Sequence, residues 1–246
     1  MIVIGIAAIL VVAYNSPRCR RYVRRLLGRQ RHRREYVDRL KERKYSPNTY
    51  NGIDVSKHQG VIRWEDVASN KGLEFVYVRA TIGSNMTDIY FKRNIEGARK
   101  HGLMVGAYHF FTSHSSVTEQ FSNYKKVVDK EQVDLIPMVD IEESHGGKWT
   151  KQQIIDSLKV FSKLIQKQYG KKPMIYSSEK FYNDNLAPYF NSYILYIAKY
   201  GEEPVVEGDY SHNLWKYTEH GHIRGIGEYV DLCRFVHDTR LKDIEL

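Results

Sequence analysis

Short apolar runs alternate with amphipathic patterns over most of the chain, starting near residue 50. Runs rich in β-branched and aromatic residues predict strands, and apolar residues spaced three or four apart predict helices. The predicted strands lie at residues 52–57, 75–82, 104–111, 136–142 and 173–178. A helix is predicted after each of them, at residues 64–70, 90–101, from 116, 150–170 and 181–190, and a proline weakens the last.

Two of these helices begin with a clear start signal. Ser116 and Glu119 have the spacing of a capping box, in which each side chain binds the backbone N–H of the other residue. Thr150 and Gln153 repeat that spacing. The second helix is expected to end at Gly170, because glycine adopts the left-handed conformation that closes a helix.

After residue 190 the helical pattern stops, and three more strands are predicted at residues 193–200, 213–218 and 228–236. Five βα units followed by three strands indicate an α/β fold, an irregular TIM-like barrel. The pattern alone leaves an open, doubly wound sheet as an alternative. In both folds the ligand site lies beyond the carboxyl ends of the strands.

The first 49 residues do not follow this pattern. Residues 1–13 are apolar, too few for a helix at about 1.5 Å per residue to cross a ~30 Å hydrocarbon core, so they fit a signal sequence better. A membrane anchor and a buried helix are the alternatives. We therefore expect a signal or anchor segment at 1–14, a basic stem at 15–49 and a barrel domain at 50–240.

The net charge of +9 is concentrated in the stem. Residues 18–44 contain 13 Lys/Arg and 3 Asp/Glu, which gives +10 and leaves −1 for the rest of the chain. The stem is suited to contact with anionic headgroups or wall polymers, so membrane contact through residues 1–44 is one expectation. It has few aromatic residues for base stacking, and we predict no nucleic-acid partner. The two cysteines, Cys19 and Cys233, define no redox compartment and are not expected to pair.

Acidic residues interrupt three of the predicted strands: Asp54, the pair Asp140 and Glu142, and Asp231. A buried ionised carboxylate is costly, so proteins rarely place one in a strand for structure alone. Asp140 and Glu142 are two apart and should share a face, where repulsion keeps a proton on one of them. A lone D-x-E is more often a cap, an ion pair or a metal site. Three acidic strands together favour catalysis, although rotamers leave the carboxyl separation, and hence retention or inversion, open.

Aromatic residues offer a second signal, because 19 of the residues are tyrosine, which stacks on flat rings and still forms hydrogen bonds. The ten histidines show no tight pair spacing typical of zinc sites, so we predict no catalytic metal and no cofactor. Phosphate-binding glycine loops and the G-x-S-x-G nucleophile motif are absent from the sequence.

Several motifs resemble those of glycoside hydrolase family 25 lysozymes. Residues 51–60 (NGIDVSKHQG) are similar to the family's first strand and residues 106–110 (GAYHF) to its third. Residues 137–142 (PMVDIE) resemble the strand with the acidic pair, and LWKYT at 214–218 and VDL at 230–232 resemble the last two strands. The resemblance covers about residues 50–237, with the motifs in family order.

The resemblance implies hydrolysis of the β-1,4 bond between N-acetylmuramic acid and N-acetylglucosamine in peptidoglycan. It implies Glu142 as the acid/base, with Asp54, Asp140 and Asp231 as the other acidic site residues. The implied sugar-binding residues are aromatic: Tyr108, Tyr176, Tyr196 and Trp215. Three positions depart from the family pattern, where tryptophan, glutamine and asparagine are usual, and they put subsite preference in doubt: Tyr196, Lys216 and Cys233.

Two other functions remain open at this point. A non-catalytic glycan-binding module on the same barrel would lack the Glu142-type acid, which is present here. A hydrolase of another acetamido-sugar polymer, such as chitin, would show the same tyrosines. We expect a monomer in the cell envelope, membrane-anchored or secreted, because peptidoglycan lies outside the cytoplasmic membrane.

Overall fold

A computed structural model describes residues 50–143, 149–208 and 212–246. The predicted signal or anchor segment and the basic stem lie outside the described residues, as does Cys19. Within the described ranges, no helix is both long and apolar enough to span a lipid bilayer.

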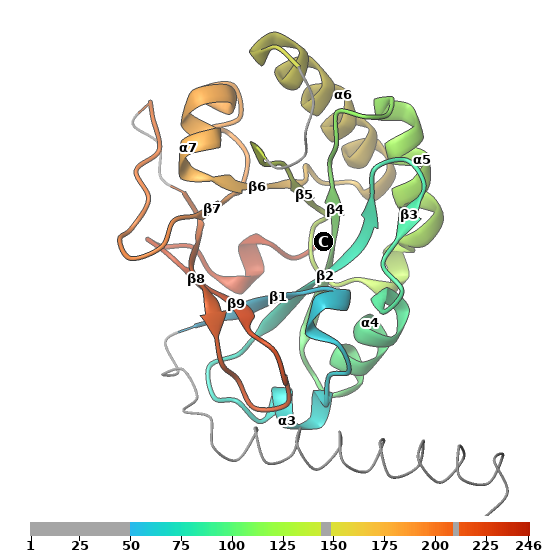
Figure 1. Cartoon of the computed structure of the whole chain (residues 1–246), viewed down its shortest axis with the longest axis vertical. Helices are drawn as coiled ribbons and strands as arrows, with labels where there is room; N and C mark the ends of the chain where they lie inside the picture. Colours follow the sequence, from blue (N-terminus) through green and yellow to red (C-terminus); the bar gives the residue numbers. More distant parts are fainter. Residues whose placement is uncertain (1–49, 144–148, 209–211) are drawn as a thin grey trace, which may run out of the picture. The chain divides into compact units, whose positions relative to one another are not determined.

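The described strands form one mixed sheet that closes into a barrel (Figure 1). Their order is β1-β9-β8-β7-β6-β5-β4-β2-β3, and pairing of β1 with β2 closes the ring. Neighbouring strands run parallel around the ring except at β9, which is antiparallel to both β8 and β1. The short strand β3 lies outside the ring and is antiparallel to β2. The strands are β1 (Gly52–Val55), β2 (Phe75–Ile82), β3 (Met86–Thr87), β4 (Met104–Phe110), β5 (Met138–Asp140), β6 (Met174–Ser178), β7 (Leu195–Ala198), β8 (Leu214–Gly221) and β9 (Val230–Phe235).

A helix follows each of the first five barrel strands, which confirms five βα units and then three strands. The α-helices are α3 (Trp64–Ala68), α4 (Phe91–Lys100), α5 (Val117–Val127), α6 (Lys151–Tyr169) and α7 (Glu179–Phe181). Short 3-10 turns are η1 (Lys57–Gln59), η2 (Lys130–Gln132) and η5 (Leu241–Asp243), and a π-helical turn, η4 (Tyr182–Leu186), continues α7.

The observed helix ends match those predicted from the sequence. The Ser116 side chain accepts from the Glu119 N–H and the Glu119 side chain accepts from the Ser116 N–H, so the capping box before α5 is complete. Thr150 and Gln153 cap α6 in the same way. Gly170 ends α6 with a φ of 91°, in the left-handed region that glycine adopts without strain.

Strands of the barrel are buried on both faces, which explains why they read as continuous apolar runs. In β2, Val76 and Val78 pack toward the helices, while Phe75 and Tyr77 point into the barrel. The interior is narrow, and Gly106 makes room for a ring: a Cβ there would lie 2.3 Å from the Tyr77 ring. Interior and exterior cores therefore alternate residue by residue along each strand.

The C-terminal segment covers one end of the interior. Ile244 is fully buried and belongs to the interior cluster with Phe75 and Leu135, near the amino ends of the parallel strands. Its carbonyl accepts the Ile136 N–H at 2.9 Å. The interior is thus filled from this end, and a site can open only at the carboxyl ends of the strands.

Two predicted elements differ from the structure. The strand expected at 136–142 is shorter and spans Met138–Asp140, although the Ile141 N–H still donates to the Tyr176 carbonyl of β6 at 3.1 Å. The helix expected at 181–190 is α7 and η4, from 179 to 186. Its backbone stops before Pro188, which cannot continue a helix.

Candidate active site

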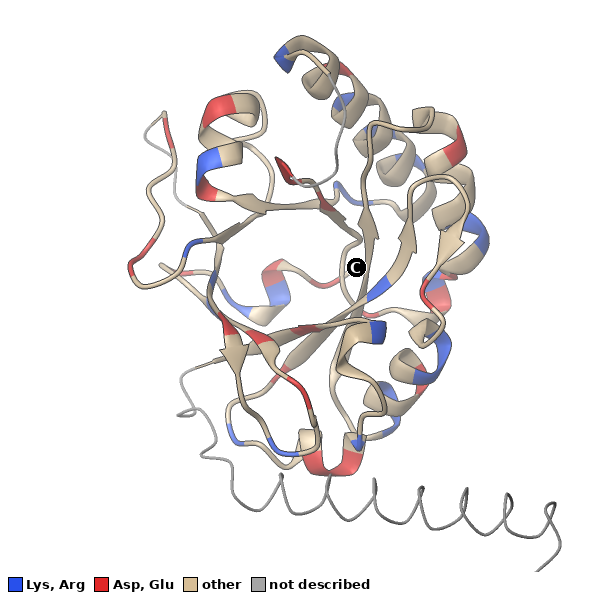
Figure 2. Cartoon of the chain, viewed as in Figure 1, with Lys and Arg blue, Asp and Glu red and all other residues tan. Residues whose placement is uncertain are grey.

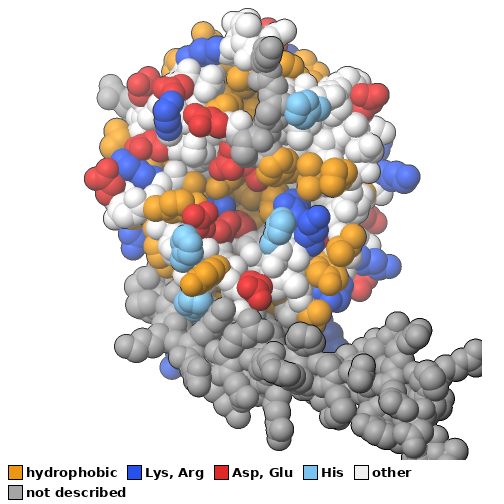
Figure 3. Space-filling view, viewed as in Figure 1, with side chains coloured by type: hydrophobic (Ala, Val, Ile, Leu, Met, Phe, Trp, Pro, Cys, Tyr) orange, Lys and Arg blue, Asp and Glu red, His pale blue; other side chains and the backbone are white. Residues whose placement is uncertain are grey.

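A polar pocket of about 180 Å³ lies where the carboxyl ends of the parallel strands meet. In Figure 2 several strands of the barrel carry acidic positions, and in Figure 3 acidic and hydrophobic side chains gather in the middle of the face shown. Ten residues line the pocket: Asp54, Tyr108, Met138, Asp140, Glu142, Tyr176, Tyr200, Lys216, Glu219 and Asp231.

Asp54 and Asp231 face each other across the antiparallel pair β1 and β9. Two like charges in directly opposite positions repel, so this pairing needs compensation. Asp54 is 4% exposed, and its Oδ2 accepts the Tyr196 hydroxyl at 2.6 Å. Burial, more than any other influence, raises the Asp54 pKa to about 6, which still leaves the carboxyl mainly ionised at neutral pH.

Lys216 supplies the compensating charge from the neighbouring strand β8. Its Nζ lies 2.8 Å from Asp231 Oδ2 and 3.3 Å from Asp54 Oδ2. The same nitrogen donates to the Tyr176 hydroxyl at 2.8 Å, and the Lys216 side chain is buried. One ammonium group thus lies between two carboxylates on the floor of the pocket, and its field lowers the Asp54 pKa from what burial alone would give.

Asp140 and Glu142 enter the pocket from the end of β5. Asp140 is the last strand residue and is buried, whereas Glu142 lies two residues beyond and is partly exposed. Burial first, and then the charge of Glu142, raise the pKa of Asp140 well above its usual range. Burial and the nearby charge of Glu142 thus both favour the protonated form of Asp140, the more deeply buried member of the pair.

The four predicted aromatic residues do not share one environment. Tyr108 and Tyr176 line the pocket. Tyr196 lies beneath it, fully buried, with its hydroxyl on Asp54. Trp215 precedes Lys216 on β8, so its side chain points to the opposite face of the sheet; its Nε1 donates to the Lys199 carbonyl at 2.7 Å.

Four lining residues were not among the predicted site residues: Met138, Tyr200, Lys216 and Glu219. Lys216 had a detectable signal, because a lysine inside the apolar run LWKY must find a partner if the strand is buried. Tyr200 and Glu219 had none, since they lie on separate segments and meet only in the fold, where the Tyr200 hydroxyl donates to Glu219 Oε2 at 3.2 Å.

The arrangement combines a partly exposed carboxyl group, a buried carboxyl group of raised pKa beside it, and an ammonium group that neutralises one of two neighbouring carboxylates. Such a set can donate a proton to a leaving oxygen and stabilise positive charge that develops on a sugar ring. The ammonium group of Lys216 already occupies the position between Asp54 and Asp231 that a cation would take.

Comparisons with known proteins agree with this chemistry. The family model described as "Glycosyl hydrolases family 25" matches residues 53–226. The protein YegX of Escherichia coli (strain K12) is 35% identical over 191 residues, covering 76% of this chain and 70% of YegX. An autolytic lysozyme of Clostridium acetobutylicum is 30% identical over 186 residues, covering 75% of this chain and 55% of that protein.

A solved structure gives the same result for the fold. The crystal structure of a bacterial lysozyme from Streptomyces coelicolor superposes with a TM-score of 0.71 at 26% identity, covering 78% of this chain and 94% of the other. The barrel expected from the sequence is therefore a known lysozyme fold.

Proposed function

The chain belongs to glycosyl hydrolases family 25 and is a lysozyme-type glycoside hydrolase, and from this premise we propose that it cleaves the β-1,4 bond between N-acetylmuramic acid and N-acetylglucosamine in peptidoglycan. The observation that carries the proposal is the pocket in which Asp54, Asp140, Glu142 and Asp231 converge at the carboxyl ends of the barrel strands. The relatives named lysozymes support the substrate class.

In this proposal Glu142 is the general acid. It is the member of the acidic pair that reaches the open part of the pocket, where a glycosidic oxygen can approach. Its proton passes to that oxygen as the bond to the anomeric carbon breaks, and the electron pair of the bond stays with the oxygen. The anomeric carbon is then electron-poor, with oxocarbenium character.

Asp140 is proposed to position the acetamido group of the muramic acid. Burial raises the pKa of Asp140 and favours its neutral form, which stabilises an oxocarbenium ion poorly but has a carbonyl oxygen that accepts a hydrogen bond from an amide N–H. The acetamido oxygen then bonds to the anomeric carbon in place of the leaving oxygen. Water, losing a proton to Glu142, later opens that ring. Direct charge stabilisation by an ionised Asp140 is the alternative step.

Asp54, Lys216 and Asp231 form the floor beneath the sugar. Lys216 balances one of the two negative charges, so the trio keeps a net charge of −1 when both carboxyls are ionised. That residual charge favours a positive sugar ring over a neutral one, which is what transition-state stabilisation requires. Tyr108 and Tyr176 provide the aromatic walls of the same pocket.

The deciding experiment is product analysis after incubation with purified peptidoglycan. New reducing ends on muramic acid identify the proposed bond, whereas reducing ends on glucosamine would contradict it. Chitin oligomers in parallel test the other acetamido-sugar substrate, and binding without any product would indicate a glycan-binding module. Peptidoglycan stripped of its N-acetyl groups should be cleaved at least about 100-fold more slowly if the acetamido oxygen is the nucleophile.

A further inference from the structure

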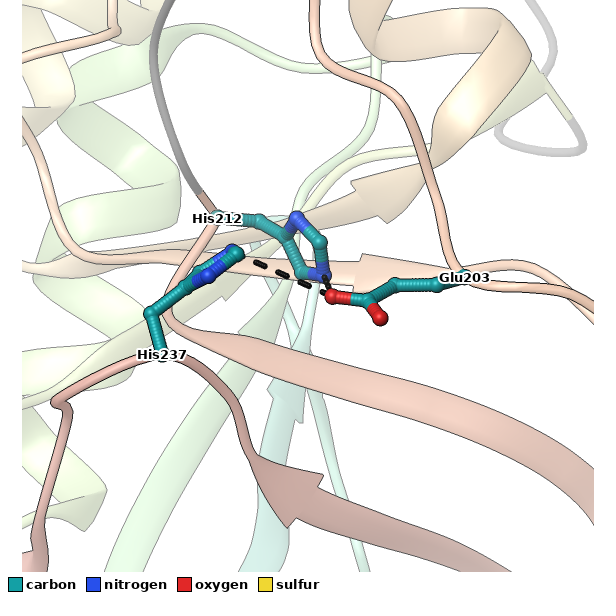
Figure 4. Close-up of side chains that lie close together, drawn as sticks. All are labelled: Glu203, His212 and His237. Atoms are coloured by element: carbon teal, nitrogen blue, oxygen red, sulfur yellow. Dashed lines mark ion pairs between the residues drawn. The ribbon is translucent and has the colours of Figure 1, made fainter.

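Glu203, His212 and His237 converge at a place outside the pocket (Figure 4). His212 lies just before β8 and His237 just after β9, whereas the pocket residue Asp231 lies near the start of β9. Glu203 comes from the segment that connects β7 to β8. In Figure 4 both imidazole rings turn toward the carboxylate of Glu203.

The two histidines are brought together by the register of β8 and β9. Leu214 pairs with Phe235 in this antiparallel ladder, and the Val236 N–H donates to the Asn213 carbonyl at 3.0 Å. Continuing the register by one residue places His212 opposite His237. Their ring centroids are 5.4 Å apart, so the pairing is a fixed consequence of the sheet.

The separations are those of ligands around one ion rather than of hydrogen bonds. Glu203 Oε1 lies 3.6 Å from His212 Nε2 and 3.9 Å from His237 Nε2, and one ligand atom from each residue falls within 4.8 Å of the others. A hydrogen bond requires about 3.2 Å or less. Two atoms bound at ~2.1 Å to one tetrahedral ion lie about 3.4 Å apart, close to these values.

His212 provides a second, independent observation. It is 3% exposed, and its Nε2 has no hydrogen-bond partner among the described residues, although a buried polar atom normally has one. The nearest acceptor shown for this atom is Glu203 Oε1 at 3.6 Å, beyond hydrogen-bond range but within the range of two ligands on one ion.

His237 adds a sign of constraint at the same place. Its φ is 54°, and among the described residues His237 is the only non-glycine residue with a positive φ. Such a conformation costs energy and persists where the surroundings hold it, often at ligand sites. Glu203 and His237 are both about half exposed, which leaves room for water as a further ligand.

We propose that Glu203, His212 and His237 form a binding site for one divalent transition-metal ion of the Zn²⁺ class, with water completing the coordination. Two imidazole nitrogens and one carboxylate oxygen are a ligand set that zinc favours over calcium or magnesium. The sequence predicts no catalytic metal, because no two histidines have the close spacing typical of zinc sites. These ligands come from three separate segments, so spacing along the chain does not reveal them.

The role that fits the location is stabilisation of an irregular crossover. Parallel strands are usually connected through a helix, but the described residues between β7 and β8 contain none. A metal ion joining Glu203 to both flanking histidines would fix this connection at its far end. None of the three ligands lines the substrate pocket, although the same connection carries Tyr200 of the pocket wall.

The test uses the full chain, freed of metal by a chelator and then dialysed. Titration calorimetry with Zn²⁺ should show one tight ion per chain that is absent from the variants below, and saturating Zn²⁺ should raise Tm by about 5 °C. Co²⁺ in place of Zn²⁺ should give the visible absorption of a four-coordinate site. Turnover at 25 °C should stay within twofold with or without metal, because the ion lies outside the pocket.

The variants His237→Ala and Glu203→Gln should each lose the bound ion and the metal-dependent Tm shift. The exposed His101→Ala is the matched control and should keep both. Comparing each variant with and without Zn²⁺ separates metal loss from any effect of the substitution on folding. Absence of one-to-one binding, or an unchanged Tm response in both ligand variants, would overturn the proposal and leave the proposed hydrolase function unaffected.

Discussion

The ammonium group of Lys216 lies 2.8 Å from the carboxylate of Asp231, in a pair that joins strands β8 and β9 on the floor of the pocket. The sequence resemblance leads us to expect glutamine at this position, whereas the chain has a lysine, and its side chain is buried. The two opposing carboxylates, Asp54 and Asp231, make such a charge favourable here. The buried ammonium group and the two carboxylates therefore compensate one another on the floor of the pocket.

Replacing Lys216 by glutamine should therefore destabilise the protein in a pH-dependent way. At pH 7 the two carboxylates lose their counter-charge, and we expect the free energy of unfolding to fall by about 2 kcal/mol or more. At pH 5 the loss should be smaller, because Asp54 without Lys216 stays protonated to higher pH. Urea unfolding at both pH values measures this. Lys180→Gln, on an exposed ion pair, is the control; equal losses at both pH values for Lys216→Gln would contradict the account.

Substitution of Glu142 by glutamine keeps the shape of the side chain and removes the transferable proton. We expect turnover on peptidoglycan to fall by about 10² to 10⁴, the usual contribution of a general acid, with Tm nearly unchanged. Glu143→Gln is a matched control, since Glu143 is adjacent, exposed and outside the pocket lining. Activity of Glu142→Gln within threefold of the unaltered protein would rule out the assignment.

The raised pKa of Asp54 predicts how stability depends on pH. In the folded protein the pKa of Asp54 is about 6, whereas in the unfolded chain it has the usual value of 3.8. Between these values the folded state binds more protons, so stability falls as pH rises through the window. Asp54→Asn should remove this part of the slope, a difference on the order of 1–3 kcal/mol between pH 4 and pH 7. Parallel pH dependences for the two proteins would show that Asp54 titrates normally.

Trp215 and Tyr200 should respond differently to substitution. Tyr200 is 51% exposed and lines the pocket, so Tyr200→Ala should raise KM about 2- to 10-fold through loss of ring stacking. Trp215→Phe should leave KM within twofold and reduce the free energy of unfolding by about 1 kcal/mol, because the bond to the Lys199 carbonyl is lost. A large increase in KM for Trp215→Phe would instead indicate that Trp215 contacts the sugar.

Removal of residues 1–49 should leave a soluble and active enzyme, because the first barrel strand begins at Gly52. In cells we expect the domain from Tyr50 onward to lie on the outer side of the cytoplasmic membrane, where peptidoglycan is. Protease added to intact cells, or to spheroplasts if an outer membrane shields the site, should digest it. Protection that ends only when the cytoplasmic membrane is lysed would contradict export.

The local features of this protein follow from its sequence. Strand and helix periods, the two capping boxes and Gly170 define most of the elements, since each depends on residues within a few positions of one another. The order of βα units then implies parallel strands and a site at their carboxyl ends. Buried acids at Asp54 and Asp140 were also predictable, because a charge inside an apolar strand is costly without a purpose.

The tertiary structure decided the relations between distant residues. Only closure of the barrel sets Lys216 between Asp54 and Asp231, and only the end of β5 at Asp140 makes that carboxyl more buried than Glu142. The convergence of Glu203, His212 and His237 likewise depends on the register of β8 with β9. Proton affinity and ion binding depend on distances of a few ångströms and on exclusion of water, which the order of residues along a chain does not specify.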